Sequence, residues 1–134
     1  GMYKIIGELE SIGDSGDAIG RMLARRNEHG KEFNEEHLKR LGRMCDLLDD
    51  AFKAMTDNLK APYTSLKDIT NAQDAEYNIN EYRNTLREEH IINIEENPSY
   101  NYQLGVFYMD IVAELEKMGD FIINVSEAKI AENG

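Results

Sequence analysis

The sequence contains no tryptophan, two prolines and a single cysteine in 134 residues. One cysteine cannot form an internal disulfide, which fits a reducing compartment. The scarcity of proline, together with abundant Glu, Leu, Lys, Ala and Arg, favours helices. No stretch approaches the roughly eighteen apolar residues that a membrane-spanning helix needs. We therefore expect a helical protein without direct insertion into the bilayer.

Basic residues are also few: 15 lysines and arginines face 26 aspartates and glutamates, which gives a formal net charge of −11. Such a charge repels phosphate groups, which argues against a general binder of nucleic acids or anionic membranes. It is compatible with cations or basic partners. The length fits a single domain, 1–134, with one core. Gly1 before Met2 is typical of tag removal, and Tyr3-Lys4-Ile5-Ile6 already resembles the middle of a helix. We therefore expect the chain to be an excised piece of a longer protein.

Four segments carry apolar residues at the three- and four-residue spacing of helices that pack in a bundle. The inward positions of the first are Ile5, Leu9, Ile12, Gly16, Ile19 and Leu23. Those of the second are Leu38, Leu41, Cys45, Leu48, Phe52, Met55 and Leu59. Those of the fourth are Leu104, Tyr108, Ile111, Leu115, Met118, Ile122 and Val125. Short connections predict an all-α fold, an antiparallel up-down four-helix bundle.

Several residues mark the ends of these helices. Asn34 is the predicted N-cap of the second helix, with two glutamates in its first turn. Ala61-Pro62 is expected to end that helix, and Gly30 is the predicted left-handed cap of the first. The stretch Glu96-Asn97-Pro98-Ser99 predicts a turn before the fourth helix.

The third segment differs, because charged or titratable residues interrupt its inward series. That series is Ile69, Ala72, Glu76, Ile79, Arg83, Leu86 and His90. In one interpretation the polar residues form a wide flank, with Ala75, Ile79 and Tyr82 facing inwards. In the other, they form an interior polar ladder that needs partners on neighbouring helices, since buried charge is costly unless paired. The ladder would consist of Glu76, Asn80, Arg83, Arg87 and His90.

An acidic phrase occurs twice: ELESIGD, starting at residue 8, returns as ELEKMGD, starting at residue 114, with five of seven positions identical. We call these the first and second copies. Each places two carboxylates four residues apart on one helix face, Glu10 with Asp14 and Glu116 with Asp120. Because like charges at this spacing repel, a positive partner is expected, either a lysine or arginine from the next helix or a metal ion. Oxygen ligands of this kind suit Mg²⁺, Ca²⁺, Mn²⁺ or iron.

Each copy also contains a glycine, Gly13 or Gly119. A glycine inside a helix costs about 1 kcal/mol relative to alanine, which predicts close approach of a backbone or a ligand beside the acids. The alternative is that both acidic stripes are simply solvated helix faces.

Other chemistries have less support. A ferritin-like di-iron centre needs Glu three residues before His, and none of His29, His37 and His90 has one. Cys45 lies on the predicted apolar face, so we expect a buried structural thiol. No nucleophile, base and orienting group can be assembled, and we expect that the protein is not an enzyme.

The repeated phrase, with Asn124 four residues after Asp120, resembles the signature of PhoU-like domains, in which an E/D-x-x-x-D motif marks each of two three-helix repeats. The stretch EYNINEYRNTLREEHI, residues 76–91, resembles the version of this domain that follows the membrane domain of bacterial sodium-dependent phosphate cotransporters. The resemblance implies that Tyr3 to Arg26 is the last helix of a first repeat. The remaining three helices would form the second repeat.

The resemblance implies regulation of phosphate transport. The chain would be a cytoplasmic regulatory domain at the inner face of the bacterial cell membrane, acting through protein contacts and cation binding. Its partner would be a membrane transport domain in the same polypeptide. One alternative is a free-standing adaptor that binds a phosphate transporter or sensor protein. Another is a purely structural helical module whose acids pair with Arg83, Arg87 and neighbouring residues. A second copy of the chain, in a homo-oligomer, is a further candidate partner.

The resemblance also implies metal ligands. Carried over residue by residue, they are Glu10, Asp14, Asp110, Glu116 and Asp120, with iron, manganese, magnesium or zinc as the ion. The first copy departs from the pattern, because Lys4 stands where the second copy has Asp110 and Ala18 stands where it has Asn124. The first site is therefore less complete.

Overall fold

The computed structural model describes residues 2–28, 33–62, 66 and 68–133, without the side chains of 26–28, 132 and 133. It contains four helices: α1 (Met2–Glu28), α2 (Glu35–Lys60), α3 (Thr70–Glu96) and α4 (Tyr102–Asn133). The described residues include no strand, so the predicted all-helical class is confirmed. None of the described helices combines the length and apolarity needed to cross a membrane.

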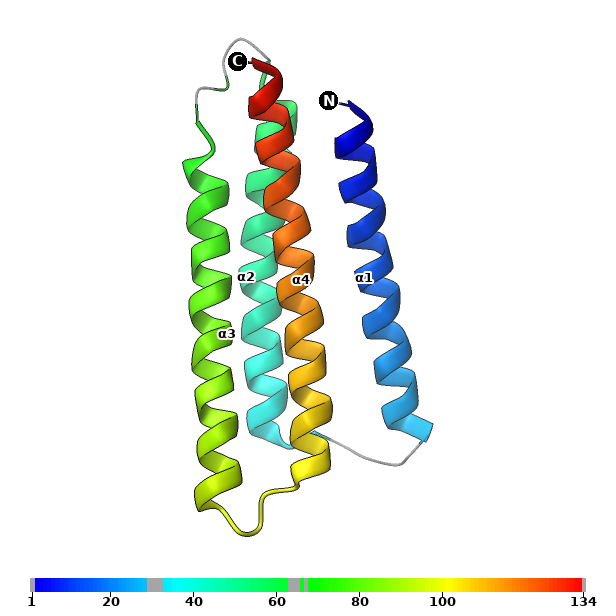
Figure 1. The fold of residues 1–134 in the computed structure, drawn as a ribbon, viewed down its shortest axis with the longest axis vertical. Coiled ribbons are helices and arrows are strands. Elements are labelled where there is room, and N and C mark those ends of the chain that lie inside the picture. Colours follow the sequence, from blue (N-terminus) through cyan, green and yellow to red (C-terminus); the bar gives the residue numbers. More distant parts are fainter. Residues whose placement is uncertain (1, 29–32, 63–65, 67, 134) are drawn as a thin grey trace.

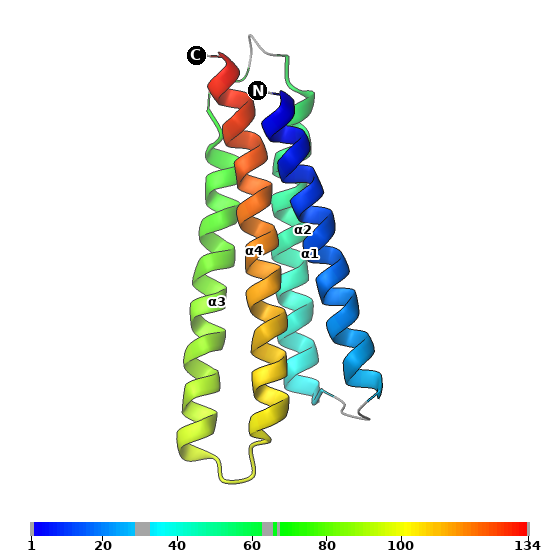
Figure 2. The same cartoon turned by 45° about the vertical axis from the view of Figure 1, so that its right-hand side comes forward.

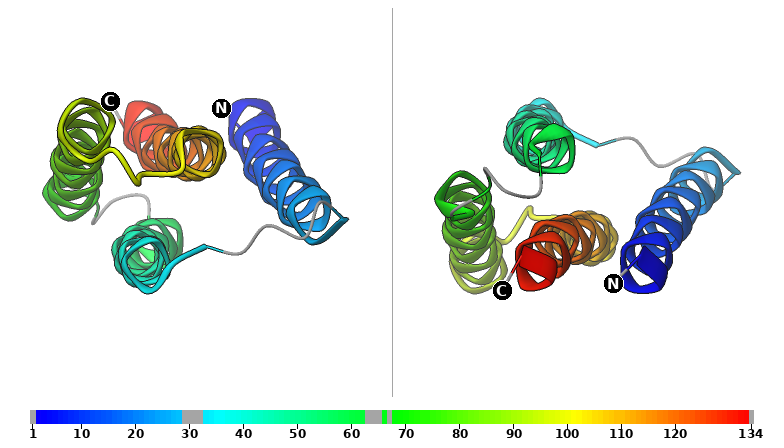
Figure 3. Two further views of the ribbon diagram at one scale, coloured as in Figure 1. Left: turned by 90° about the horizontal axis from the view of Figure 1, so that it is seen from below. Right: turned by 90° about the horizontal axis from the view of Figure 1, so that it is seen from above.

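The helices are long and lie roughly side by side (Figure 1). The chain runs from top to bottom along α1 and α3 and from bottom to top along α2 and α4, and Figure 2 shows the same order from another side. Viewed end-on, α2, α3 and α4 form a triangle, and α1 lies outside it against α4 (Figure 3). Among the described helices, Cα distances of 8 Å or less join α1 to α4 alone. The helix α4 thus belongs to a three-helix unit with α2 and α3, and it also packs against α1.

The predicted helix ends are confirmed wherever the structure describes them. The Oδ1 atom of Asn34 accepts a hydrogen bond from the backbone N–H of His37 at 2.7 Å, which caps α2. The helix ends at Lys60, just before Ala61-Pro62. The turn after Glu96 is closed by a bond from the Tyr100 N–H to the Asn97 carbonyl at 3.0 Å. The predicted cap at Gly30 lies outside the described residues.

The core is centred on α4, and its predicted inward face is correct. Of the seven positions, Leu104, Tyr108, Ile111, Leu115, Ile122 and Val125 are buried and Met118 is half-buried. Val112 and Ile123 are buried as well. This helix buries a broad surface because it has neighbours on three sides.

The predicted inward face of α2 is correct only in part. Leu48 and Met55 are buried, and Leu41, Phe52 and Leu59 are half-buried against the core, but two predicted positions are exposed. Cys45 is exposed, so it is not a buried structural thiol, and Leu38 is 53% exposed. The buried residues also include a series at seven-residue spacing that was not predicted, His37, Met44, Ala51 and Asn58. Cys45 follows Met44 directly, and one residue turns a helix by about 100°, which carries the thiol out of the interface.

The predicted inward face of α1 is correct only in part. Ile5 and Ile12 are buried, whereas Leu9, Gly16 and Leu23 are exposed. The reason is that α1 has a single helical neighbour among the described residues, so only a narrow stripe of its surface is covered.

Candidate functional site

The second copy of the acidic phrase has an arginine as its positive partner. Nη1 of Arg83 on α3 forms an ion pair with Oε1 of Glu116 on α4, and the two side chains are only 20% and 19% exposed. Of the two partners that the sequence left open, a basic side chain or a metal ion, the structure therefore supplies a basic side chain. This pair joins the predicted polar ladder to the predicted acidic stripe.

Further carboxylates lie along the same α3–α4 edge. Partial burial and the neighbouring Glu116 raise the pKa of Asp120, although Arg83 acts in the opposite direction. Burial, Asp120 and Glu127 raise the pKa of Glu76 on α3. The edge is therefore rich in negative charge that a single arginine only partly balances.

The first copy, on α1, lies beside the second, on α4, and the chain runs in opposite directions along these two helices (Figure 1). Nδ2 of Asn124 donates to Oε2 of Glu8 at 3.2 Å, and Lys4 Nζ is 3.8 Å from Oε1 of the same glutamate. Further along, Met118 on α4 lies over Gly16, with its Cε 3.9 Å from where a Cβ would be. The acid of the first copy that faces α4 is thus Glu8, which the sequence analysis did not select.

The other predicted metal ligands do not converge. Glu10, Asp14 and Asp110 are exposed, and within the described ranges Glu10 and Asp14 have no ion-pair partner. In the part of the chain that the structure describes, no three His, Cys, Asp or Glu side chains are grouped so as to hold a metal ion. A metal role for them therefore stays a prediction.

The two glycines have different surroundings. A Cβ on Gly119 would lie 3.1 Å from Cδ1 of Ile79 and 3.7 Å from Cδ2 of Leu48. A Cβ on Gly13 would meet nothing within 4 Å. Close approach is therefore present in the second copy alone, and apolar side chains of α2 and α3 make it.

The polar ladder follows the edge of α3. Glu76, Asn80, Arg83 and His90 are half-buried and Arg87 is exposed. The residues that face the core are Ala72, Ala75, Ile79 and Leu86, with Tyr82 packed partly against it. These apolar residues of α3 lie inwards, and the polar ladder lies beside them.

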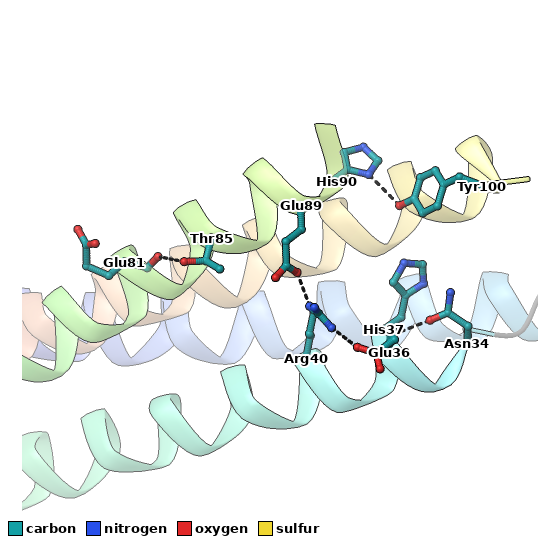
Figure 4. A network of polar contacts seen from close by, with 9 residues as sticks. All are labelled: Asn34, Glu36, His37, Arg40, Glu81, Thr85, Glu89, His90 and Tyr100. Carbon is teal, nitrogen blue, oxygen red and sulfur yellow. Dashed lines mark hydrogen bonds and ion pairs between the residues drawn. The ribbon is translucent and has the colours of Figure 1, made fainter. Parts of the chain in front are cut away.

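A second group of polar side chains surrounds a cavity of about 400 Å³ between the first turns of α2, the last turns of α3 and the start of α4. Arg40 pairs with both Glu36 and Glu89, as Figure 4 shows. On the far side, Nδ1 of His90 lies 2.9 Å from the Tyr100 hydroxyl.

The cavity wall also includes His37, whose ring stacks on Tyr108 with 4.2 Å between centroids and 15° between planes. Burial, Arg40 and His90 lower the pKa of His37, and burial lowers that of His90. Burial raises the pKa of Tyr108. These three groups are therefore uncharged at neutral pH. The sequence analysis did not identify His37, although its seven-residue spacing from Met44 could have indicated that it is buried.

Comparison with known proteins does not identify a family. No family model, no curated protein and no solved structure matches this chain. Indications of function therefore come from the sequence and from the contacts of the chain itself.

Proposed function

We propose that this chain is a regulatory domain that acts through helix-to-helix contact with a partner protein, and that it is not an enzyme. The partner is a sodium-dependent phosphate cotransporter, and the contact is made at the cytoplasmic face of the membrane. The resemblance of the acidic phrase and of residues 76–91 to PhoU-like domains supports the choice of transporter. The exposed face of α1 supports the mode of action.

In this proposal the chain is part of an antiparallel PhoU-like helical bundle, and helices of the partner cover the face of α1 that the described helices leave open. The helix α1 is the last helix of one three-helix repeat, and α2, α3 and α4 are the other repeat. This division is supported by the position of α1 outside the triangle of the other three helices (Figure 3). It is also supported by the seven-residue phrase that α1 and α4 share.

The observation that carries the proposal is a difference in burial between equivalent residues. Aligning the two copies pairs Ile6 with Val112 and Leu9 with Leu115. On α4, Val112 is 0% and Leu115 is 6% exposed, whereas on α1, Ile6 is 47% and Leu9 is 41% exposed. The α4 residues are covered by the helices of its own repeat. The α1 residues form a face of the same kind that is left open to a partner.

The charges on this face indicate the chemistry of the partner. Glu116 is neutralised by Arg83 on the covering helix α3, whereas its equivalent, Glu10, is exposed, as is Asp14. A helix that covers the face of α1 would therefore be expected to present a lysine or arginine to these two carboxylates, beside apolar residues that cover Ile6 and Leu9.

The contact can be tested by crosslinking in bacterial cells that express the chain together with a sodium-dependent phosphate cotransporter. A photo-crosslinking amino acid in place of Leu9 should trap the transporter. The same amino acid in place of Tyr77, which is 64% exposed on α3, is the control and should not. Equal trapping from both positions, or none from position 9, would contradict the proposed contact.

Regulation can be tested in the same cells by measuring sodium-dependent phosphate uptake. PhoU-like domains restrain uptake, so expression of the chain should lower the uptake rate. Glu10→Lys with Asp14→Lys should abolish the effect, because the face would then repel a basic partner. Asp46→Lys with Asp50→Lys makes the same charge change at exposed positions on α2 and should keep the effect. Uptake that does not respond to the chain would contradict the choice of transporter.

A further inference from the structure

The cavity at the lower end of the three-helix unit is bordered by two buried side chains with unpartnered polar atoms. His37 is 6% and Tyr108 is 2% exposed, and neither His37 Nδ1 nor the Tyr108 hydroxyl has a hydrogen-bond partner among the described residues. Both residues line the cavity. Figure 4 shows the His37 ring projecting from α2 towards His90 and Tyr100. Buried polar groups are normally paired, so a pair of unpartnered groups beside a cavity calls for an explanation.

The opposite end of α2 shows what a purely structural arrangement looks like in this protein. Asn58 occupies the same seven-residue repeat as His37 and is 4% exposed. Its amide donates to Asn71 at 3.1 Å and to Ser126 at 2.9 Å, and its carbonyl accepts from Asn71 at 3.2 Å. On this face of α2, the Asn58 amide is therefore hydrogen-bonded within the protein, whereas Nδ1 of His37 is left available to a ligand.

The cavity has an excess of negative charge and aromatic walls. Its formal charges are those of Arg40, Glu36 and Glu89, which amount to one excess carboxylate within a chain of net charge −11. Four of its lining residues carry aromatic rings, His37, His90, Tyr100 and Tyr108. Carboxylates and aromatic faces both attract organic cations. The volume of about 400 Å³ is within the range of small-molecule sites, about 300–1,000 Å³.

We propose that this cavity binds a small organic cation with N–H donors, a protonated amine of about the size of benzylamine. The ammonium group donates to His37 Nδ1 and to the Tyr108 oxygen. In the neutral imidazole with its proton on Nε2, Nδ1 accepts a hydrogen bond, as a phenol oxygen does. Its apolar part lies against the aromatic rings and Leu86. This proposal is independent of the contact made by α1.

Two other ligand classes fit the cavity less well. An anion such as phosphate would meet the excess carboxylate, and Arg40 is already engaged by Glu36 and Glu89. A metal ion would need more ligands, and the described residues contain no group of three His, Cys, Asp or Glu side chains that could supply them. An amine needs only the acceptors and aromatic faces that are present.

The test uses three ligands of similar size and different charge, benzylamine, benzyl alcohol and benzoate, titrated into the isotope-labelled chain and followed by NMR. Benzylamine should produce saturable shifts of the His37, His90 and Tyr108 ring signals. Benzyl alcohol should bind more weakly and benzoate not at all. Tyr108→Phe, which removes a single oxygen atom, should weaken benzylamine binding at least tenfold. Tyr77→Phe makes the same change at an exposed site and should leave binding unchanged.

A second variant, His37→Phe, keeps an aromatic ring at the buried position and should also weaken benzylamine binding. The proposal is overturned if benzoate binds as well as benzylamine, or if Tyr108→Phe binds benzylamine as tightly as the unmodified chain. It is also overturned if the shifts do not saturate and spread over the acidic surface, because the cation would then be attracted by net charge alone.

Discussion

On α4, the residues of the acidic phrase pack against α2 and α3, whereas α1, which carries the equivalent residues, contacts only α4 among the described helices. Leu115 is buried where Leu9 is not, Gly119 is overlaid by Ile79 where Gly13 is open, and Glu116 has an arginine where Glu10 has none. Nearly identical sequences thus have different environments. The sequence of the phrase determines which face of its helix is suited to packing. The neighbouring helices determine whether that face is buried.

The largest expected effect comes from truncating the equivalent leucines. Leu115→Ala should lower the free energy of unfolding by about 2–5 kcal/mol, because a buried leucine leaves a cavity. Leu9→Ala should cost less than about 1 kcal/mol, since 41% of that residue is already exposed and alanine favours the helix. Urea unfolding of both variants measures the difference. Equal losses would show that α1 and α4 are covered to the same extent.

The two glycines should respond to alanine with opposite signs. Gly13→Ala should raise the free energy of unfolding by roughly 0.5–1 kcal/mol, because it restores helix propensity in open space. Gly119→Ala should lower it by about 1 kcal/mol, because the new methyl group would lie 3.1 Å from Cδ1 of the fully buried Ile79. Thermal melting of the two variants would measure these opposite changes in stability. A stabilising Gly119→Ala would mean that Ile79 moves aside easily.

Removal of the paired acids should have a smaller effect. Glu116→Ala with Asp120→Ala should leave the protein folded and cost on the order of 1 kcal/mol, because Arg83 loses its partner near the surface. Glu10→Ala with Asp14→Ala, the matched pair on α1, should be close to neutral.

The same variants test the predicted metal role of the acids. Melting curves with Mn²⁺, Mg²⁺ and Fe²⁺ would favour it only if an ion stabilises the unmodified chain and not the Glu116–Asp120 variant. Outright unfolding of that variant would show instead that these acids are indispensable structural partners.

The smallest expected effect is a dependence on pH. The raised pKa of Asp120 means that the folded protein binds this proton more readily than the unfolded chain does. The ionised carboxylate therefore lowers stability at neutral pH, and this penalty is relieved as the pH falls through the raised pKa towards about 4. Asp120→Asn should be more stable than the unmodified chain at pH 7, with the gap narrowing on acidification. A gap that widens on acidification would reverse the sign assigned here.

The parts of the fold that local spacing determines were predictable. The inward face of α4, the N-cap at Asn34 and the break after Lys60 depend on residues close in sequence, and the structure has them as expected. The face of α2 was predictable only in part, because a histidine occupies an inward position at His37 and a leucine occupies an exposed one at Leu38. In the first turn of α2, the polarity of the residues alone therefore indicates the wrong buried face.

The candidate sites were predictable only in part. The repeated acids indicated that a positive group would be near, and Arg83 was among the residues singled out, but their pairing depends on how α3 and α4 are set against each other. The unequal exposure of the two copies depends on which helices are neighbours, which no local pattern encodes. The stacking of His37 on Tyr108 joins residues far apart in sequence and could not be anticipated from spacing.

Residue-level footprinting by hydroxyl radicals tests the central claim most directly, because it reports the exposure of Leu9 and Leu115 in one sample. In the purified chain, Leu9 should be modified readily and Leu115 protected. When the phosphate cotransporter is present, modification of Leu9 should fall to the level of Leu115, while that of the exposed Tyr77 stays unchanged. Strong protection of Leu9 in the isolated chain, or no change on adding the transporter, would contradict the account.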